Sequence, residues 1–128
     1  MTLLRSIGVQ PTPQRTAVAE FVLKGNTHPT ADEIFEGARR VCPTVSRATV
    51  YNTLNLLVAK GVLKSQVLRE GTVVFEPNSK KHHHFIDDET GAIHDIPWDS
   101  LVVTGEQNLS GFEVREFQVV LRGRKKKA

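Results

Sequence analysis

The sequence predicts an α+β fold in which short helices come first and strands follow. Three helix-like segments with recognisable capping residues occupy the N-terminal part, a hairpin pattern follows them, and strand-like runs dominate the remainder. The chain has 128 residues, of which 39% are hydrophobic, so it is long enough for two small domains with modest cores. Domains of this size often depend on a metal ion or a partner chain for stability.

Capping residues define the first two helices. The first is expected to begin at Pro13, with Thr12 as its N-cap, and to end at Gly25. The second is expected to begin after Thr30 and to end before Pro43, because the residue that precedes a proline avoids the helical region. The apolar stripes of the two helices predict buried side chains at Ala17, Val18, Phe21, Val22, Ile34, Phe35 and Ala38.

A third helix is expected from Ser46, its N-cap, to about Lys60, and a hairpin follows with strands over residues 62–68 and 72–76. The core-facing stripe of this third helix consists of Val50, Leu54, Leu57 and Val58. Three short helices followed by a hairpin is the order of a winged helix-turn-helix, in which the third helix enters the major groove of DNA. A different, polar face of this helix is either a solvated surface or the DNA contact, made by Arg47, Thr49, Tyr51 and Asn52.

The character of the chain changes after residue 76. Residues 77–81 are expected to form a hinge, and strands are expected over residues 82–87, 92–96 and 114–122. A weaker pattern indicates a helix over residues 100–107. We therefore expect a winged-helix domain over residues 1–76, a second, small α/β domain over residues 82–122, and a basic tail over residues 123–128.

Three consecutive histidines open the first strand after the hinge. Side chains alternate along a strand, so His82 and His84 share one face and His83 lies on the other. A four-residue turn after this strand would set position 84 opposite position 95, which adds Asp95 to the face of His82 and His84. Two groups elsewhere could converge on the same place, Glu76 at the hinge and a histidine between the first two helices, His28.

Three histidines and two carboxylates suit iron(II), manganese or zinc, rather than the closed thiolate sites of structural zinc. The alternative is a surface histidine run with no ligand role. The single cysteine, Cys42, excludes an intramolecular disulfide framework and a four-cysteine zinc site. The sequence has no apolar run of about 18 residues and no signal peptide pattern, so we expect a cytoplasmic protein that makes no membrane contact. The net charge of +3 depends on five basic residues between positions 122 and 127 at the C-terminal end, because the remainder of the chain has a net charge of −2.

The chain resembles the ferric uptake regulator family over nearly its whole length. Four motifs carry the resemblance in the family's order and spacing: GVQPTPQR over residues 8–15, HPTADEI over residues 28–34, SRATVYNTL over residues 46–54, and HHH over residues 82–84 with GAIHD over residues 91–95. The family implies a homodimer that binds a double-stranded DNA operator, with a regulatory metal between a winged-helix domain and a β-rich dimerisation domain. Its ligands map onto His28, Glu76, His82, His84 and Asp95. Arg15 and Ser46 belong to these motifs and complete the expected DNA-binding set.

The resemblance implies a mechanical role for His28, which belongs to the DNA-binding part while most of the other ligands follow the hinge. One metal ion would then fix the angle between the two parts, and with it the spacing of two recognition helices in a dimer. Three positions depart from the family. Asp87-Asp88-Glu89-Thr90 replaces the first cysteine pair of the structural zinc site, Gln10 replaces a basic residue before Pro11, and Glu76 stands where the peroxide-sensing branch usually has aspartate.

The last ligand position predicts the signal to which the regulator responds. Asp95 resembles the peroxide-sensing branch, in which bound iron(II) leads hydrogen peroxide to oxidise the histidines that match His28 and His82. The absent structural zinc and the triple histidine resemble the haem-responsive iron regulators of the same family instead. His83 and His94 could form a second metal or haem site, or are simply exposed polar residues. The chain is not expected to be an enzyme; a metal-dependent hydrolase and a metal-storage protein are the alternatives from other classes.

Overall fold

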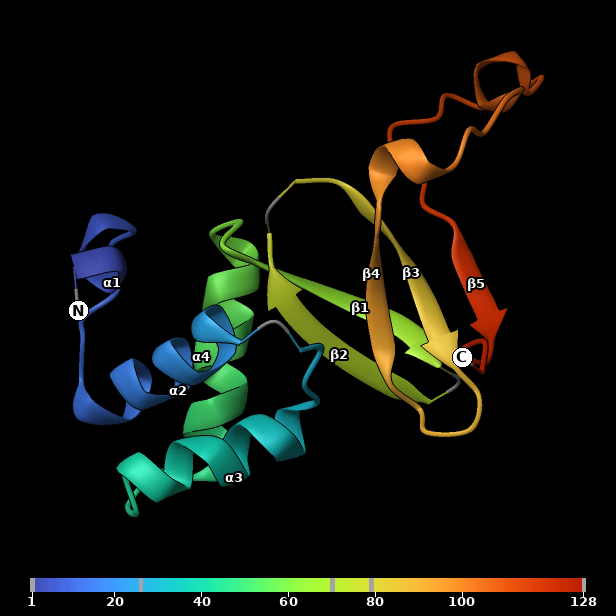
Figure 1. Cartoon of the computed structure of the whole chain (residues 1–128). Coiled ribbons are helices and arrows are strands. Elements are labelled where there is room, and N and C mark those ends of the chain that lie inside the picture. Colours follow the sequence, from blue (N-terminus) through green and yellow to red (C-terminus); the bar gives the residue numbers. More distant parts are fainter. Residues whose placement is uncertain (1, 26, 70, 79, 128) are drawn as a thin grey trace. The chain divides into compact units, whose positions relative to one another are not determined.

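The computed structural model describes residues 2–25, 27–69, 71–78 and 80–127, and Figure 1 shows its elements along the chain. The chain divides into two compact units, Met1–Asn78 and Ser79–Ala128. We describe each unit by itself. Among the described residues, none of the helices is both long and apolar enough to span a bilayer.

The first unit contains four helices followed by a two-stranded hairpin. Its elements are α1 Thr2–Ser6, α2 Pro13–Lys24, α3 Ala31–Val41, α4 Arg47–Ala59, β1 Leu63–Arg69 and β2 Thr72–Pro77. The three longer helices and the hairpin were predicted, and their order is that of a winged helix-turn-helix. Helix α1 was not predicted, because five residues are too short to show a helical period.

Side-chain caps begin the three longer helices where the sequence predicts them. The hydroxyl of Thr12 accepts a hydrogen bond from the backbone N–H of Arg15, and Ser46 accepts one from Thr49 at the start of α4. Helix α3 begins with a complete capping box, in which Thr30 and Glu33 accept hydrogen bonds from each other's backbone N–H groups. The Ser46 cap fixes the first turn of α4, which is the turn that a winged helix presents to DNA.

The core of the first unit lies between α2, α3, α4 and the hairpin. Its fully buried members include Val18, Val22, Ile34, Ala38, Val50, Leu54 and Leu57. Phe21 departs from its predicted burial and is 38% exposed, because its ring lies over Gly37 of α3 instead of inside the core. A Cβ atom at Gly37 would lie 2.0 Å from Cε2 of Phe21, so this glycine is what lets the ring lie against α3.

Strands β1 and β2 pair antiparallel, with Lys64 opposite Glu76 and an irregularity between Val67 and Arg69. Beyond the hairpin, the loop that precedes α3 pairs with β2. The backbone N–H of Phe75 donates to the carbonyl of Pro29 at 2.9 Å, and Thr30 forms an isolated bridge with Val74. The loop between α2 and α3 is therefore attached to the second strand of the wing.

The second unit contains a three-stranded sheet in the order β4-β3-β5. Strand β3, His82–Asp87, pairs antiparallel with β4, Ile93–Pro97, and parallel with β5, Val120–Gly123. The pairing of β3 with β4 places His84 opposite Asp95, which confirms the register predicted from the four-residue turn. Isoleucine 86 is the most buried apolar residue of this sheet.

Two predictions for the second unit are wrong. The helix expected over residues 100–107 does not form; two short 3₁₀ turns, Trp98–Ser100 and Glu106–Asn108, flank an irregular segment. The left-handed backbone of Gly105, with φ of 91°, and the β-branched pair Val102 and Val103 both oppose an α-helix there. The strand expected over residues 114–122 is shorter and spans Val120–Gly123, the stretch that pairs in register with His84–Asp87 of β3.

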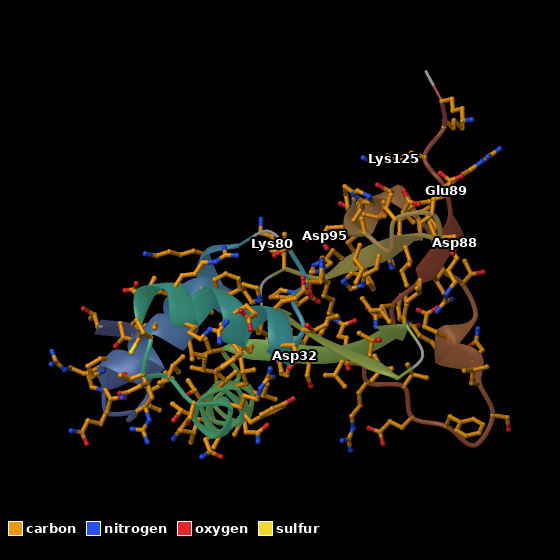
Figure 2. All side chains as sticks on the ribbon, turned by 90° about the horizontal axis from the view of Figure 1, so that it is seen from below. Asp32, Lys80, Asp88, Glu89, Asp95 and Lys125 are labelled. Carbon is orange, nitrogen blue, oxygen red and sulfur yellow. The ribbon has the colours of Figure 1, made fainter. Side chains whose placement is uncertain are left out.

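Hydrogen bonds close the turn between β3 and β4. This turn occupies the position of the first cysteine pair of the family's structural zinc site. The Asp87 carboxylate accepts from the backbone N–H groups of Glu89, at 2.8 Å, and Thr90, at 3.2 Å. Gly91, with φ of 76°, donates to the carbonyl of Asp87 at 2.7 Å. Glu89 lies on the exposed side of this turn (Figure 2) and forms an ion pair with Arg124, with Oε1 and Nη1 3.7 Å apart.

The turn makes the stability of the second unit dependent on pH. The hydrogen bonds from Glu89 and Thr90 outweigh the effect of burial and hold the pKa of the Asp87 carboxyl below its ordinary value. A depressed pKa in the folded state stabilises the fold above the unfolded pKa, near 4, and this stabilisation is lost as pH falls through the folded value. Replacing Asp87 with asparagine is therefore expected to lower the free energy of unfolding at neutral pH, and to lower it progressively less in acid.

Urea unfolding of the wild type and Asp87→Asn, measured from about pH 7 down to about pH 2, checks this expectation. Asp88→Asn is the matched control, because the Asp88 side chain is exposed on the same turn. A stability difference between wild type and Asp87→Asn that stays constant across the acid range would contradict the assigned role.

Candidate metal centre

In the first unit, two of the expected ligands lie side by side. His28, in the loop between α2 and α3, and Glu76, on β2, have Nε2 and Oε2 2.8 Å apart, and both side chains are buried. The pairing of Pro29 with Phe75 explains this proximity, because each is the chain neighbour of one ligand. A local main-chain contact thus joins two residues that are 48 positions apart in the sequence.

Glu76 is also oriented from its other side. The side-chain amide of Gln66, on β1, donates a hydrogen bond to Oε1 of Glu76 at 2.6 Å. Each oxygen of the carboxylate therefore has a defined neighbour, Gln66 on one side and His28 on the other. Partners that orient a carboxylate in this way are typical of metal ligands.

In the second unit, the remaining three expected ligands share one face of the sheet. Nε2 of His82 lies 3.4 Å from Oδ1 of Asp95, and Nε2 of His84 lies 3.9 Å from the same oxygen. Among His82, His84 and Asp95, the candidate donor atoms all lie within 4.8 Å of one another. The strand period places the two histidines on this face, and the pairing of His84 with Asp95 brings in the carboxylate.

A main-chain carbonyl fixes the ring of His82. Nδ1 of His82 lies 2.9 Å from the carbonyl oxygen of Lys80. Because a carbonyl oxygen only accepts hydrogen bonds, Nδ1 carries the proton in this contact, and Nε2, which faces Asp95, is the ring nitrogen that remains for a metal ion. A histidine ligand whose other ring nitrogen donates to a carbonyl is the usual arrangement at metal sites.

The chemistry of these side chains fits a divalent metal ion. The group in the first unit offers one imidazole and one carboxylate, and the group in the second offers two imidazoles and one carboxylate; donors of both kinds suit iron(II), manganese(II) or zinc(II). The described residues include no cysteine beside these ligands, since the single cysteine, Cys42, lies in the first unit near Thr44. The donors therefore match a regulatory divalent ion and do not match a structural four-cysteine zinc.

His83 and His94 lie on the other face of the same sheet. His83 is buried and stacks on Trp98, with ring centroids 4.4 Å apart, while its Nδ1 accepts a hydrogen bond from the backbone N–H of Val119. His94 is half-buried, opposite Phe85 in the register. Among the described residues, neither histidine belongs to a group of three or more potential metal ligands. The geometry of His83 is that of a packed side chain.

The expected DNA-contacting residues differ in exposure. Tyr51 and Asn52 are exposed on α4. Ser46 and Thr49 are engaged with each other at the start of α4, with their hydroxyl oxygens 3.0 Å apart. The guanidinium of Arg15 donates to the carbonyl of Gln10 at 3.1 Å.

Arg47, the first residue of α4, has two partners on α3. Its guanidinium forms an ion pair with Asp32 and lies over the ring of Phe35, with Cζ 4.5 Å from the ring centroid. Sequence patterns did not reveal these partners, and they did not reveal Gln66. The residues lie on other helices or strands, and only the helix packing and the register of the irregular hairpin bring them together.

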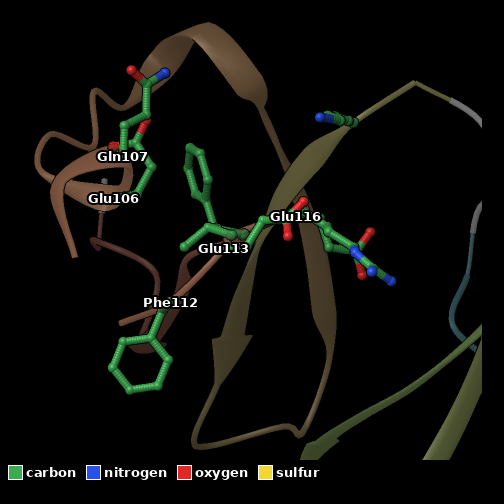
Figure 3. Close-up of a pocket in the computed structure, with 9 residues that line it drawn as sticks. Glu106, Gln107, Phe112, Glu113 and Glu116 are labelled. Atoms are coloured by element: carbon green, nitrogen blue, oxygen red, sulfur yellow. The ribbon is translucent and has the colours of Figure 1, made fainter. Parts of the chain in front are cut away.

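A cavity of about 490 Å³ lies in the second unit, and none of the expected ligands lines it. Figure 3 shows Glu106, Gln107, Phe112, Glu113 and Glu116 along it. Its acidic and aromatic lining offers no histidine, and it shares no residue with the expected metal or DNA-binding sets.

The chain is similar to known proteins of one family. The model of the ferric uptake regulator family matches residues 6–122. The peroxide-responsive repressor PerR of Staphylococcus aureus (strain USA300) is 32% identical over 122 residues, which cover 94% of this chain and 82% of the relative. The ferric uptake regulator of Pseudomonas aeruginosa with manganese is 25% identical, with a TM-score of 0.72 over 98% of this chain and 97% of that chain.

A second solved structure supports the fold alone. The ferric uptake regulator of Francisella tularensis with iron has a TM-score of 0.78 at 22% identity and covers 93% of both chains. The family model spans most of the sequence, the PerR relative exceeds 30% identity, and the α+β architecture agrees with both solved structures. The chain therefore belongs to the ferric uptake regulator family of metal-binding, DNA-binding transcriptional regulators.

Proposed function

We propose that this chain is a metal-dependent, homodimeric repressor that binds a double-stranded DNA operator. One divalent metal ion per chain, iron(II) or manganese(II) in the cell and zinc(II) as an occupant after purification, takes His28, Glu76, His82, His84 and Asp95 as ligands. The single observation that carries the proposal is the grouping of these ligands. His28 and Glu76 form an oriented pair in the first unit, and His82, His84 and Asp95 converge in the second.

In this proposal the metal supplies a positive charge that both groups of ligands share. The first group belongs to the winged-helix unit and the second to the sheet unit, so binding one ion couples the arrangement of the two units to metal occupancy. In a dimer that arrangement sets the distance between two recognition helices, which must match half-sites on one duplex. The affinity for DNA then depends on metal.

The second unit is the proposed dimerisation domain. Its irregular segment exposes large apolar side chains, including Val102 at 87% and Phe112 at 75%, and Leu109 is also exposed. Apolar exposure of this extent in a small unit is typical of a surface that a partner chain covers. A second copy of the chain is the partner that the proposal requires.

Within the winged-helix unit, Tyr51 and Asn52 are the proposed DNA-contacting residues of α4, because both are exposed and carry hydrogen-bonding groups. Arg47 is the proposed phosphate-contacting residue at the start of the same helix. Its ion pair with Asp32 joins side chains that are 57% and 73% exposed, and such pairs contribute little stability. The guanidinium can therefore exchange Asp32 for a phosphate at low cost.

Removing the competing carboxylate is expected to strengthen DNA binding. Asp32→Asn should raise the affinity for any duplex by roughly two- to five-fold, the range that corresponds to an exposed ion pair. Arg47→Gln should lower the affinity and reduce the slope of log affinity against log salt by about 1. Fluorescence anisotropy with labelled duplexes measures both, and Asp99→Asn is the matched control because it removes one exposed aspartate from the second unit. Equal gains in Asp32→Asn and Asp99→Asn would mean that overall charge, and not the release of Arg47, is responsible.

The proposed signal is hydrogen peroxide. The relative from Staphylococcus aureus is named as a peroxide-responsive repressor, and this chain has an aspartate, Asp95, at the last ligand position. A bound iron(II) ion would activate peroxide beside the imidazole rings by one-electron transfer and would be restored in the net reaction. In the net reaction one oxygen atom of hydrogen peroxide enters a ring C–H bond of His28 or His82, the ring loses two electrons, and the other oxygen leaves as water. An oxidised imidazole is a poorer ligand, so the metal and then the DNA are released.

DNA binding with and without metal tests the proposed function. Duplexes selected from a random pool by the manganese-loaded protein should bind about 100-fold more tightly with manganese than with a chelator, a difference of about 2.7 kcal/mol, within the usual range of allosteric coupling. Equal affinity in the two conditions would exclude a metal-dependent repressor. Failure to select any duplex would exclude the DNA-binding function itself.

A further inference from the structure

A cavity in the first unit lies at the start of α2, beside α4. It has a volume of about 290 Å³, and Figure 1 shows α2 and α4 packed against each other. Six described residues line it, and none of them is acidic. They are Thr12, Gln14, Arg15, Thr49, Asn52 and Thr53. The lining thus offers three hydroxyls, two amides and one guanidinium, which are all groups that donate hydrogen bonds to an anion.

One of these residues carries a buried hydroxyl that the rest of the described chain does not satisfy. Thr53 is 1% exposed, and its Oγ1 has no hydrogen-bond partner among the described residues. A buried polar group in this state is destabilising, and native proteins usually compensate it with a bound ligand or water. Because Thr53 lines the cavity, a ligand there would receive this hydrogen bond.

The electrostatics of the cavity favour a negative ligand. Helix α2 has 12 residues and begins at this cavity, with Thr12 as its N-cap and Pro13 in the first turn. The N-terminus of a helix of this length carries a partial positive charge and attracts anions, above all phosphate groups. The guanidinium of Arg15 adds a full positive charge at the same end of the cavity.

We propose that this cavity is a phosphate site, and that its ligand is one phosphodiester group of the DNA backbone. The inference rests on the proposed DNA-binding function and deepens it, because it assigns Thr12, Gln14 and Thr53 to the interface. It also changes the role of two residues that sequence reasoning placed among the base-contacting groups. Thr49 and Asn52 face the cavity and contact the backbone beside the major groove, which leaves Tyr51 as the exposed base reader.

Free inorganic phosphate has the same chemistry, and the geometry favours the DNA backbone as its source. The cavity opens beside α4, the helix that enters the major groove in this fold, so a backbone phosphate arrives there whenever the helix docks. Phosphate contacts fix the register of the protein on the duplex and do not read its sequence. The site therefore contributes equally to binding of any duplex.

The decisive variant is Thr53→Val, which removes the buried hydroxyl and keeps the shape of the side chain. Manganese-loaded Thr53→Val should bind both a selected and an unrelated duplex about ten-fold more weakly, the loss expected for one hydrogen bond to a charged group. Its melting temperature should be equal to or higher than that of the wild type, because an unsatisfied buried group has been removed. Thr53→Ser, which keeps the hydroxyl, should restore DNA affinity. A loss of affinity that tracks a loss of melting temperature would instead assign Thr53 a purely structural role.

A second variant tests the charge of the cavity. Gln14→Glu places a carboxylate in the lining and should lower the slope of log affinity against log salt by about 1. Gln107→Glu is the matched control, because it adds the same charge at an exposed position of the second unit. Two outcomes would overturn the phosphate site and leave the proposed function intact, provided that the wild type binds DNA with manganese. One is an equal effect of Gln14→Glu and Gln107→Glu. The other is a DNA affinity that neither Gln14→Glu nor Thr53→Val changes.

Titration with inorganic phosphate separates the two sources and remains informative if the protein binds no DNA. Amide chemical shifts of Gln14 and Arg15 should move with phosphate in the wild type and not in Gln14→Glu. If phosphate saturates the site but neither cavity variant changes the affinity for DNA, the site belongs to the free anion, and the assignment to the DNA backbone is wrong. Absence of any shift would exclude an anion site, whether or not the protein binds DNA.

Discussion

Replacing Glu76 with glutamine is expected to lower the affinity for manganese(II) by on the order of 100-fold or more, and to remove metal-stimulated DNA binding. The substitution keeps the volume of the side chain and removes the negative charge that a divalent ion requires. Changes to groups that merely orient metal ligands cost 10- to 100-fold in affinity, so loss of a direct carboxylate ligand should lie at or beyond the upper end of that range. Glu76 is buried between His28 and Gln66, so the substitution removes a carboxylate that its neighbours hold in place.

Calorimetric titration with manganese(II) measures the metal affinity, and anisotropy with a selected duplex measures the DNA affinity. Glu36→Gln, at an exposed position on α3, is the matched control and should change neither quantity. The melting temperature of the metal-free proteins separates a lost ligand from a damaged fold. If Glu76→Gln binds manganese as tightly as the wild type, Glu76 is not a ligand and the proposed coordination is wrong.

Exposure of the iron(II) form to hydrogen peroxide is expected to add 16 daltons to His28 or His82 and to release the protein from DNA. Oxidation is expected only at imidazole rings that contact the iron, and among the three histidine ligands His28 and His82 are those that match the oxidised histidines of the peroxide-sensing branch. His83 and His94 lie on the opposite face of the sheet and serve as controls within the same chain. The manganese(II) form should remain unmodified and bound to DNA, because manganese(II) gives up an electron to peroxide far less readily than iron(II).

Peptide mass spectrometry after digestion locates the added oxygen, and anisotropy records the release of DNA in the same sample. Two results would exclude the peroxide signal. One is DNA release without modification of either histidine. The other is an intact iron(II) protein that binds haem on titration, with an absorption band that depends on His83 or His94, because this would favour the haem-responsive reading of the triple histidine.

Much of the fold follows from local rules. The caps at Thr12, Thr30 and Ser46 begin α2, α3 and α4 where the sequence predicts, because a cap is a property of a few adjacent residues. The face shared by His82, His84 and Asp95 follows from the period of a strand and the length of one turn. These parts of the site needed no information beyond nearby sequence.

The errors arise where distant residues decide the outcome. Phe21 was expected in the core, yet Gly37 on another helix offers its ring an alternative surface. Residues 100–119 combine helix-like and strand-like patterns, and pairing with β3 is what limits the last strand to Val120–Gly123. The contact between Gln66 and Glu76 could not be predicted from the hairpin turn. An irregularity in β1 lies between Gln66 and the turn, so the length of the turn does not give the register of the two strands.

The central claim is that one metal ion takes ligands from both units. Pulsed electron paramagnetic resonance of the manganese(II) protein, labelled with ¹⁵N-histidine, counts the imidazole nitrogens bound to the ion. We predict three nitrogens in the wild type and two in His28→Ala, because His28 is the only histidine ligand that the first unit supplies to the proposed site. Two nitrogens in the wild type, unchanged in His28→Ala, would show that the ion is held by the sheet alone and would contradict the account.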